Sequence, residues 1–100
     1  MENLKINNGK VEIWTNIGSL VKTIATNKAL AADFNADQSL IAITTANGKV
    51  EIWKKSGSLI RTIGQGNATN ARWNGSEIAV STNKGKTELW TQTGSLIRTF

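Results

Sequence analysis

The sequence contains no cysteine and no histidine. Their absence excludes disulfides, thiolate nucleophiles and imidazole bases, together with the usual ligands of zinc. No apolar run approaches the length of about 20 residues that spans a bilayer, and the first ten residues lack the basic and apolar segments of a secretory signal. We therefore expect a cytoplasmic protein that has no membrane segment, no metal site and no cofactor.

The chain does have a balanced composition over its 100 residues. Apolar residues make up 39% and charged residues 19%, which argues against intrinsic disorder and leaves enough apolar side chains for one modest core. The composition therefore predicts a single folded domain.

One motif occurs three times at a spacing of just under 40 residues. It reads GKVEIWTNIGSLVKTI at residues 9–24, GKVEIWKKSGSLIRTI at 48–63 and GKTELWTQTGSLIRTF at 85–100. Trp14 and Trp53 are 39 residues apart, whereas Trp53 and Trp90 are 37 apart, so the second interval has lost two residues. A fixed period of this size indicates a repeat architecture, in which each unit packs on its neighbours.

Each copy of the motif has the pattern of two β-strands. Aliphatic residues alternate with glutamate before each tryptophan, and a period of two places them on one face of a strand. A Gly-Ser turn follows, and then a second alternating segment with β-branched residues. Asparagine and glycine accept positive φ, so we expect residues 7–9, 46–48 and 83–85 to form two-residue hairpins into the Trp-bearing strands.

The segments between the motifs predict two more strands in each unit. One strand is expected at residues 29–34 and again at 68–73, and another at 40–45 and 78–82. The first unit begins in its second strand, because residues 4–6 align with 43–45 at the 39-residue offset. We therefore divide the chain into a partial unit at 1–24 and complete units at 25–63 and 64–100, all within one domain.

Four antiparallel strands per unit, with a tryptophan closing the third strand, is the pattern of one β-propeller blade. In this pattern the sequence resembles the WD40 family, through NGKVEIW at 47–53, GSLIRTI at 57–63 and NADQSLIA at 35–42. It departs from the family at Thr15, Lys54 and Thr91, where the family has aspartate after tryptophan, and no Gly-His dipeptide precedes the first strand. The resemblance implies an all-β fold of propeller blades without the family's Asp-His hydrogen-bond network.

A row of fewer than three complete blades leaves two sheet faces uncovered. Propellers typically close with four to eight blades, so two copies packed head to tail would make a ring of six. We therefore expect a homodimer. The alternative is that these residues are a piece of a longer propeller protein, whose other blades complete the ring. An enzyme is one interpretation of that longer protein.

The repeated aromatic residues are interpreted as structural. Trp14, Trp53 and Trp90 occupy one position of the repeat, where they would pack between blades. The recurring cations Lys22, Arg61 and Arg98 lie on the outermost strand of each unit, where charge discourages pairing of sheet edges.

The formal charge of +5 favours anionic partners. The propeller resemblance places two sets of loops on one rim of the ring, and these loops supply our candidate ligand-binding residues: Lys10, Lys28, Asn47, Lys49, Asn67, Lys84 and Lys86. Such a rim would hold an acidic protein segment. The alternative ligands are nucleic acid, bound through its phosphates, and carbohydrate.

Nothing in the sequence points to catalysis. The repeated glutamates lie two residues after repeated lysines, as in Lys49 and Glu51, and read as surface ion pairs. No two carboxylates are spaced for acid and base roles, and no serine has a candidate base beside it. We predict a non-enzymatic binding or scaffold module that assembles with itself and engages a protein partner through its loop rim.

Overall fold

The computed structural model describes residues 2–24 and 28–100, which form eleven β-strands in three antiparallel sheets. The first sheet has the order β1-β2-β3, the second β4-β5-β6-β7 and the third β8-β9-β10-β11. Their bounds are β1 Glu2–Asn7, β2 Lys10–Thr15, β3 Leu20–Ile24, β4 Ala29–Phe34, β5 Leu40–Thr45, β6 Val50–Lys54, β7 Leu59–Ile63, β8 Ala68–Asn74, β9 Glu77–Thr82, β10 Thr87–Thr91 and β11 Leu96–Thr99. The predicted all-β fold is confirmed.

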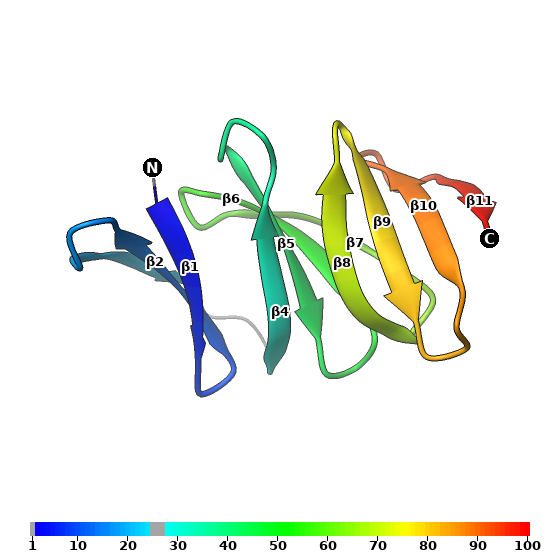
Figure 1. Ribbon diagram of the computed structural model, residues 1–100, viewed down its shortest axis with the longest axis horizontal. Coiled ribbons are helices and arrows are strands. Elements are labelled where there is room, and N and C mark those ends of the chain that lie inside the picture. Colours follow the sequence, from blue (N-terminus) through cyan, green and yellow to red (C-terminus); the bar gives the residue numbers. More distant parts are fainter. Residues whose placement is uncertain (1, 25–27) are drawn as a thin grey trace.

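The three sheets stand side by side in a row, with β1 to β3 at one end and β8 to β11 at the other (Figure 1). The molecule is accordingly elongated, with principal extents of 39 × 26 × 20 Å. The predicted beginnings of the first and second units, at residue 1 and residues 25–27, lie outside the described residues.

The hairpins before the Trp-bearing strands are of two kinds. Asn8 and Gly9 have φ values of 53° and 77° and form the predicted two-residue loop between β1 and β2. The same prediction is wrong for the other two sheets, whose loops have three residues. In the second sheet, Thr45 N donates to Lys49 O over 2.9 Å and Gly48 N donates to Thr45 O over 3.0 Å.

This difference in loop length changes the register of the first strand. Leu4 pairs with Ile13, whereas Ala42 is the residue that pairs with the equivalent Ile52. Leu4 therefore corresponds to Ala42, and the predicted alignment of residues 4–6 with 43–45 is wrong by one residue. A shift by one residue exchanges the two faces of a strand, so it decides which side chains meet the next sheet.

Two apolar clusters hold the row together, one at each boundary between sheets. The first cluster joins the first and second sheets and contains Val11, Ile13, Ile24, Ala29, Ile41 and Ile43. The second cluster joins the second and third sheets and contains Ala42, Val50, Ile52, Ile63, Ala68, Ala71, Ile78, Val80 and Trp90. Burial of these aliphatic faces is the main driving force for stacking the sheets.

None of the described residues forms a helix that is long and apolar enough to cross a membrane.

Candidate functional site

The repeated tryptophans lie on the side of each sheet that faces the preceding one. Trp90 is 9% exposed within the second cluster, and Trp53 is half-buried and packs against the first cluster. Trp14 is also half-buried, but it lies on the face of the first sheet that has no described neighbour. The same repeat position therefore has a neighbouring sheet in two units and lacks one in the first.

Each tryptophan is held by the glutamate two residues before it. The indole Nε1 donates to the glutamate Oε1 over 3.0 Å from Trp14 to Glu12, and over 3.1 Å from Trp90 to Glu88. Trp53 and Glu51 make the same bond. Glu88 is only 4% exposed, so the interpretation of the glutamates as surface ion-pair partners is wrong for this residue. A buried indole N–H needs an acceptor, and the glutamate supplies it.

The cations of the outer strands reach across the boundary between sheets. A Cβ atom on Gly57 would lie 3.3 Å from Lys22 Cδ, and one on Gly94 would lie 3.1 Å from Arg61 Cδ. Each cation thus covers the turn glycine of the following unit, which is a packing role that the sequence interpretation did not include. Gly18, the equivalent glycine of the first unit, has no neighbouring atom within 4 Å of its Cβ position.

The loops that carry Asn47 and Asn67 meet at the boundary between the second and third sheets, whereas Lys10 and Lys28 lie at the boundary between the first and second sheets. Gly48 has φ +81°, and a Cβ there would lie 2.2 Å from Gly66 O, so only glycine permits this approach. Ala68 N donates to Gly48 O, and Asn83 N donates to Asn67 O, each over 2.9 Å. These bonds fix the connection at 64–67 against the hairpin loops at 46–48 and 83–85.

A depression of about 340 Å³ lies between these loops. Its lining consists of Leu30, Ala46, Asn47, Gly48, Gly66, Asn67, Ala68, Thr69 and Asn83. The structure therefore brings together two of the predicted ligand-binding residues, Asn47 and Asn67, and adds Asn83, which the sequence interpretation missed.

The two predicted asparagines differ in how their side chains are used. Asn47 Oδ1 accepts hydrogen bonds from Thr45 Oγ1 and, over 3.2 Å, from Lys49 N, so it stabilises its own turn. Asn67 Oδ1 is buried and has no hydrogen-bond partner among the described residues. A buried acceptor without a donor is costly, so this oxygen destabilises the packed loops.

The predicted lysines of the rim lie outside the lining of the depression. Lys49 is half-buried, and its Nζ donates to Gly64 O over 3.2 Å. The others are exposed, namely Lys10, Lys28, Lys84 and Lys86. Their ligand-binding role stays a prediction.

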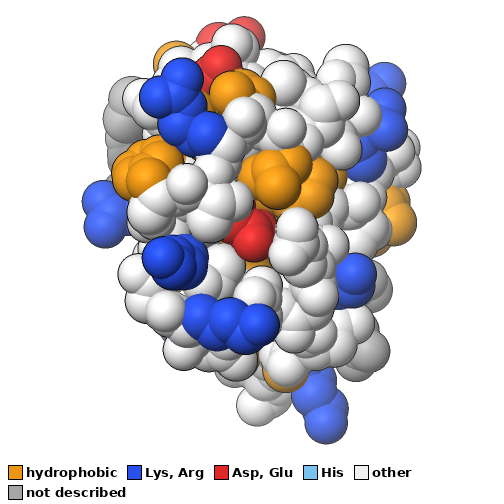
Figure 2. Space-filling model, turned by 90° about the vertical axis from the view of Figure 1, so that its right-hand side faces the viewer, with side chains coloured by type: hydrophobic (Ala, Val, Ile, Leu, Met, Phe, Trp, Pro, Cys, Tyr) orange, Lys and Arg blue, Asp and Glu red, His pale blue; other side chains and the backbone are white. Residues whose placement is uncertain are grey.

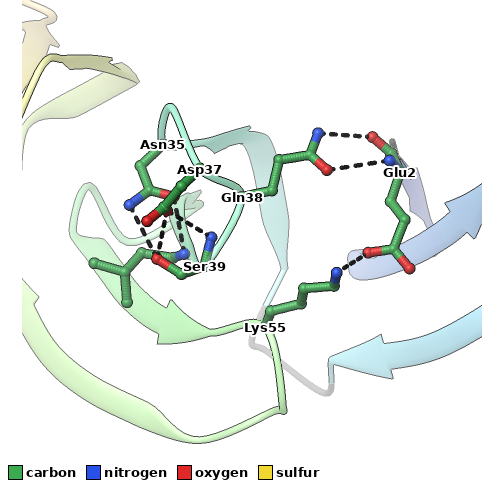
Figure 3. Close-up of polar contacts among 7 residues, drawn as sticks. Glu2, Asn35, Asp37, Gln38, Ser39 and Lys55 are labelled. Atoms are coloured by element: carbon green, nitrogen blue, oxygen red, sulfur yellow. Dashed lines mark hydrogen bonds and ion pairs between the residues drawn. The ribbon is translucent and has the colours of Figure 1, made fainter.

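The opposite rim carries a polar contact that the sequence interpretation missed. Gln38, in the turn between β4 and β5, accepts a bond from Glu2 N and donates to Glu2 O, each over 3.1 Å (Figure 3). Lys55 Nζ forms an ion pair with the carboxylate of Glu2. These contacts connect the first sheet to the second. The signal was available, because this turn is two residues longer than its counterpart at 74–77 and has room for Gln38.

The turn that carries Gln38 is shaped by an aspartate. The Asp37 carboxylate accepts from Ser39 Oγ over 2.6 Å and from Ser39 N over 3.0 Å. The hydrogen bonds from the Ser39 side chain and backbone lower the pKa of Asp37, because they stabilise its ionised form. Gln38 itself has φ +62°, which the surrounding hydrogen bonds maintain.

The inner strands of the second and third sheets are also joined directly. Trp73 N donates to Asp33 Oδ2 over 3.0 Å, and Trp73 Nε1 donates to Asp33 O over 3.1 Å. Trp73 packs against the second cluster. Within residues 2–24 and 28–100, no group of acidic side chains is arranged to hold a metal ion.

Comparison with protein-family models gives no match, and comparison with curated proteins gives none either. Solved structures are similar to the chain over its whole length. They include a chain in the crystal structure of the mitotic checkpoint complex (TM-score 0.84, 19% identity), the structure of U3-55K (0.86, 11%) and the crystal structure of the RRP9 WD40 repeats (0.85, 11%).

These matches cover 97%, 99% and 99% of this chain but only 32%, 35% and 34% of the three neighbours. The chain thus spans about a third of the length of each. At such low identity the likeness defines the fold alone, and that fold is a row of β-propeller blades of the WD40 type. The fold expected from the repeat is therefore confirmed.

Proposed function

We propose that the chain is a non-enzymatic scaffold that packs head to tail with a second copy into a six-bladed ring and binds a protein partner at its loop rim. The observation that carries this proposal is the difference in burial at one repeat position. Ile24 and Ile63 are 2% and 4% exposed because the next sheet covers them, whereas the equivalent Phe100 is 67% exposed. A large aromatic side chain at this position favours a further blade beyond the third sheet.

The turn glycines support the same contact. Lys22 and Arg61 each lie over the turn glycine of the following unit, while Gly18 is uncovered and Arg98 has no following unit within the chain. Placing the first sheet of a second copy after the third sheet would set Arg98 over that copy's Gly18. A ring closes when this head-to-tail contact is repeated, and two copies meet that condition with two-fold symmetry.

The two open faces are less apolar than the faces inside the chain. By strand alternation, Asn3 and Lys5 of the first sheet occupy positions where the second sheet has Ile41 and Ile43. The open face of the third sheet carries Ala79, Ser81, Thr87 and Leu89, with exposed hydrophobic side chains near its middle (Figure 2). This composition favours a reversible association over a permanent one.

The solution mass tests assembly. Light scattering after size exclusion, over a range of protein concentrations, is expected to show a species of about twice 10.8 kDa that dissociates on dilution. Phe100→Ser is expected to weaken this association at least about tenfold, because it removes the central aromatic contact. Ile97→Ser, on the neighbouring strand β11 and 41% exposed, is the matched control and should change it little. A monomeric wild-type chain at every concentration would overturn self-assembly.

Rim binding is supported by the exposed lysines Lys10, Lys28, Lys84 and Lys86. An acidic partner segment suits this rim, since the lysines attract its carboxylates. One solved neighbour is part of a protein complex, the mitotic checkpoint complex, which agrees with a protein partner.

A labelled polyglutamate peptide tests the rim by fluorescence anisotropy. The double variant Lys84→Ala/Lys86→Ala is expected to weaken binding several-fold, whereas Lys54→Ala, at the opposite rim, should leave it unchanged. The affinity should fall as salt is raised, because the attraction is between exposed charges. Tighter binding of single-stranded DNA than of the peptide, or equal effects of the two variants, would contradict a protein partner at this rim.

A further inference from the structure

The inner edge of the first sheet is unpaired in the described part of the chain. In the second and third sheets the innermost strands are β4 and β8, which pair with β5 and β9. The first sheet begins with β1, which stands at the position of β5 and β9. A four-stranded repeat therefore has one place for a strand that residues 2–24 and 28–100 do not fill.

The register of β1 identifies the backbone groups that face this edge. The two-residue loop makes Asn7 and Lys10 a hydrogen-bonded pair, and such pairs alternate along antiparallel strands. Asn3, Lys5 and Asn7 therefore bond to β2. The N–H and C=O groups of the intervening residues, Glu2, Leu4 and Ile6, point to the inner edge.

Glu2 shows that this edge accepts amide groups. The side chain of Gln38 bonds both Glu2 N and Glu2 O (Figure 3). In the second sheet, Leu40 stands at the position of Glu2, and Asn35 satisfies its N–H and C=O through Oδ1 and the backbone N, each over 3.0 Å. Gln38 thus occupies the position where an inner strand would end. The backbone groups of Leu4 and Ile6 face the rest of that strand position, which the described residues do not fill.

The two inner strands in the chain define the chemistry of an occupant. Their aligned sequences, ALAADF and ATNARW, share a small residue at the first and fourth positions and an aromatic residue at the sixth. The first alanines, Ala29 and Ala68, are 6% and 5% exposed, so a larger side chain would not fit there. Both aromatic residues, Phe34 and Trp73, pack against the apolar clusters.

We propose that the inner edge of β1 binds an extended segment of a partner protein as an added antiparallel strand, with the pattern small-x-x-small-x-aromatic. Main-chain hydrogen bonds to Leu4 and Ile6 would provide affinity, and the small and aromatic side chains would provide specificity. A second copy of the chain cannot supply this strand from its described residues, because its own β4 and β8 already pair within their sheets. The site lies within one copy and does not require the ring.

The probe is a labelled, end-capped peptide of sequence NATNARWNG, taken from residues 67–75, and its binding to the full chain is measured by fluorescence anisotropy. Saturable binding is expected, with a scrambled peptide of the same composition binding at least about tenfold more weakly. Ile6→Pro removes the edge-facing N–H without removing a bond to β2, and it should weaken binding about tenfold. Ile6→Thr retains the N–H and is the matched control.

Amide hydrogen exchange provides the second measurement. Leu4 and Ile6 are expected to gain protection when the peptide binds, while exposed amides of β11 at the outer edge of the third sheet do not. Circular dichroism checks that both Ile6 variants fold. Absence of saturable binding, equal binding of the scrambled peptide, or undiminished binding to a folded Ile6→Pro variant would each overturn the proposal. Because the solution mass is measured on the same samples, failure here is distinguishable from failure of self-assembly.

Discussion

The boundary between the second and third sheets and the open end of the third sheet are made by the same repeat, but their environments differ. Ile63 is 4% exposed at the boundary, and Phe100 is 67% exposed at the open end. Val50 and Ile52 at the boundary become Thr87 and Leu89 at the end, where both are half-buried. The comparison teaches that the strand pattern creates an apolar face, whereas the neighbouring sheet decides whether that face becomes core.

The largest loss of stability is expected from truncating a buried side chain at the boundary between the second and third sheets. Ile52→Ala removes a 1% exposed side chain from the second cluster and should lower the free energy of unfolding by about 2–5 kcal/mol. Ile97→Ala, on the exposed outer strand, should cost less than about 1 kcal/mol. Urea unfolding followed by tryptophan fluorescence measures both. Similar losses for the two variants would contradict the assignment of the core to this boundary.

Two equivalent glycines sharpen the comparison further. Gly48 and Gly85 both have positive φ, but a Cβ on Gly48 would lie 2.2 Å from Gly66 O, and one on Gly85 would meet nothing within 4 Å. Gly48→Ala is expected to lower the free energy of unfolding by about 2–4 kcal/mol, because the backbone must move as well as accept strain. Gly85→Ala should cost only the strain, about 1 kcal/mol. Thermal melting distinguishes the two, and equal shifts would refute close packing of the loops.

The Trp-Glu bond is expected to matter most where it is buried. Glu88→Ala leaves the Trp90 indole N–H without its acceptor in a buried site and should cost about 1–3 kcal/mol. Glu88→Gln keeps an acceptor oxygen and serves as the control. The same truncation at Glu12, on the open face of the first sheet, should cost less than about 1 kcal/mol, because water replaces the acceptor. Urea unfolding of all three variants would show the order, and a larger loss at Glu12 would reverse the comparison.

The smallest effect is expected from the exposed turn at Asp37. Its pKa is lowered in the native state below the ordinary value of 3.8, mainly by the side-chain bond from Ser39. The resulting stabilisation is present above the unfolded-state pKa and is lost as pH falls through the lowered native pKa. Asp37→Asn keeps an acceptor but cannot titrate, so it should reduce the fall in melting temperature below pH about 4. An unchanged acid profile would show that this turn makes no contribution.

The repeat predicted the strands well because their pattern is local. Val11 and Ile13 alternate with polar residues, and a period of two is sufficient to predict a strand and one apolar face. The loop lengths were harder to predict, since Asn8-Gly9 makes a two-residue hairpin while the similar Asn47-Gly48 belongs to a three-residue loop. That single residue moved the register of β1 and thereby its inward-facing groups.

The candidate sites were predicted only in part. Asn47 and Asn67 were singled out by their place in the loops, and the structure brings them to one depression. The contacts of Gln38 with Glu2 and of Asp33 with Trp73 were not predicted, because each joins residues more than 30 positions apart. Lys22 and Arg61 were read as edge charges, since their contact with the next unit's turn glycine appears only when the sheets are stacked.

The strand pattern, the four-strand unit and the propeller-type fold follow from periodicity and repetition along the amino-acid sequence. The three-dimensional arrangement of the sheets is needed to see which faces are covered, which glycines must remain glycine and which backbone edge is open. Those properties depend on the stacking of one sheet on the next, and stacking brings together groups whose separation in sequence carries no local signal.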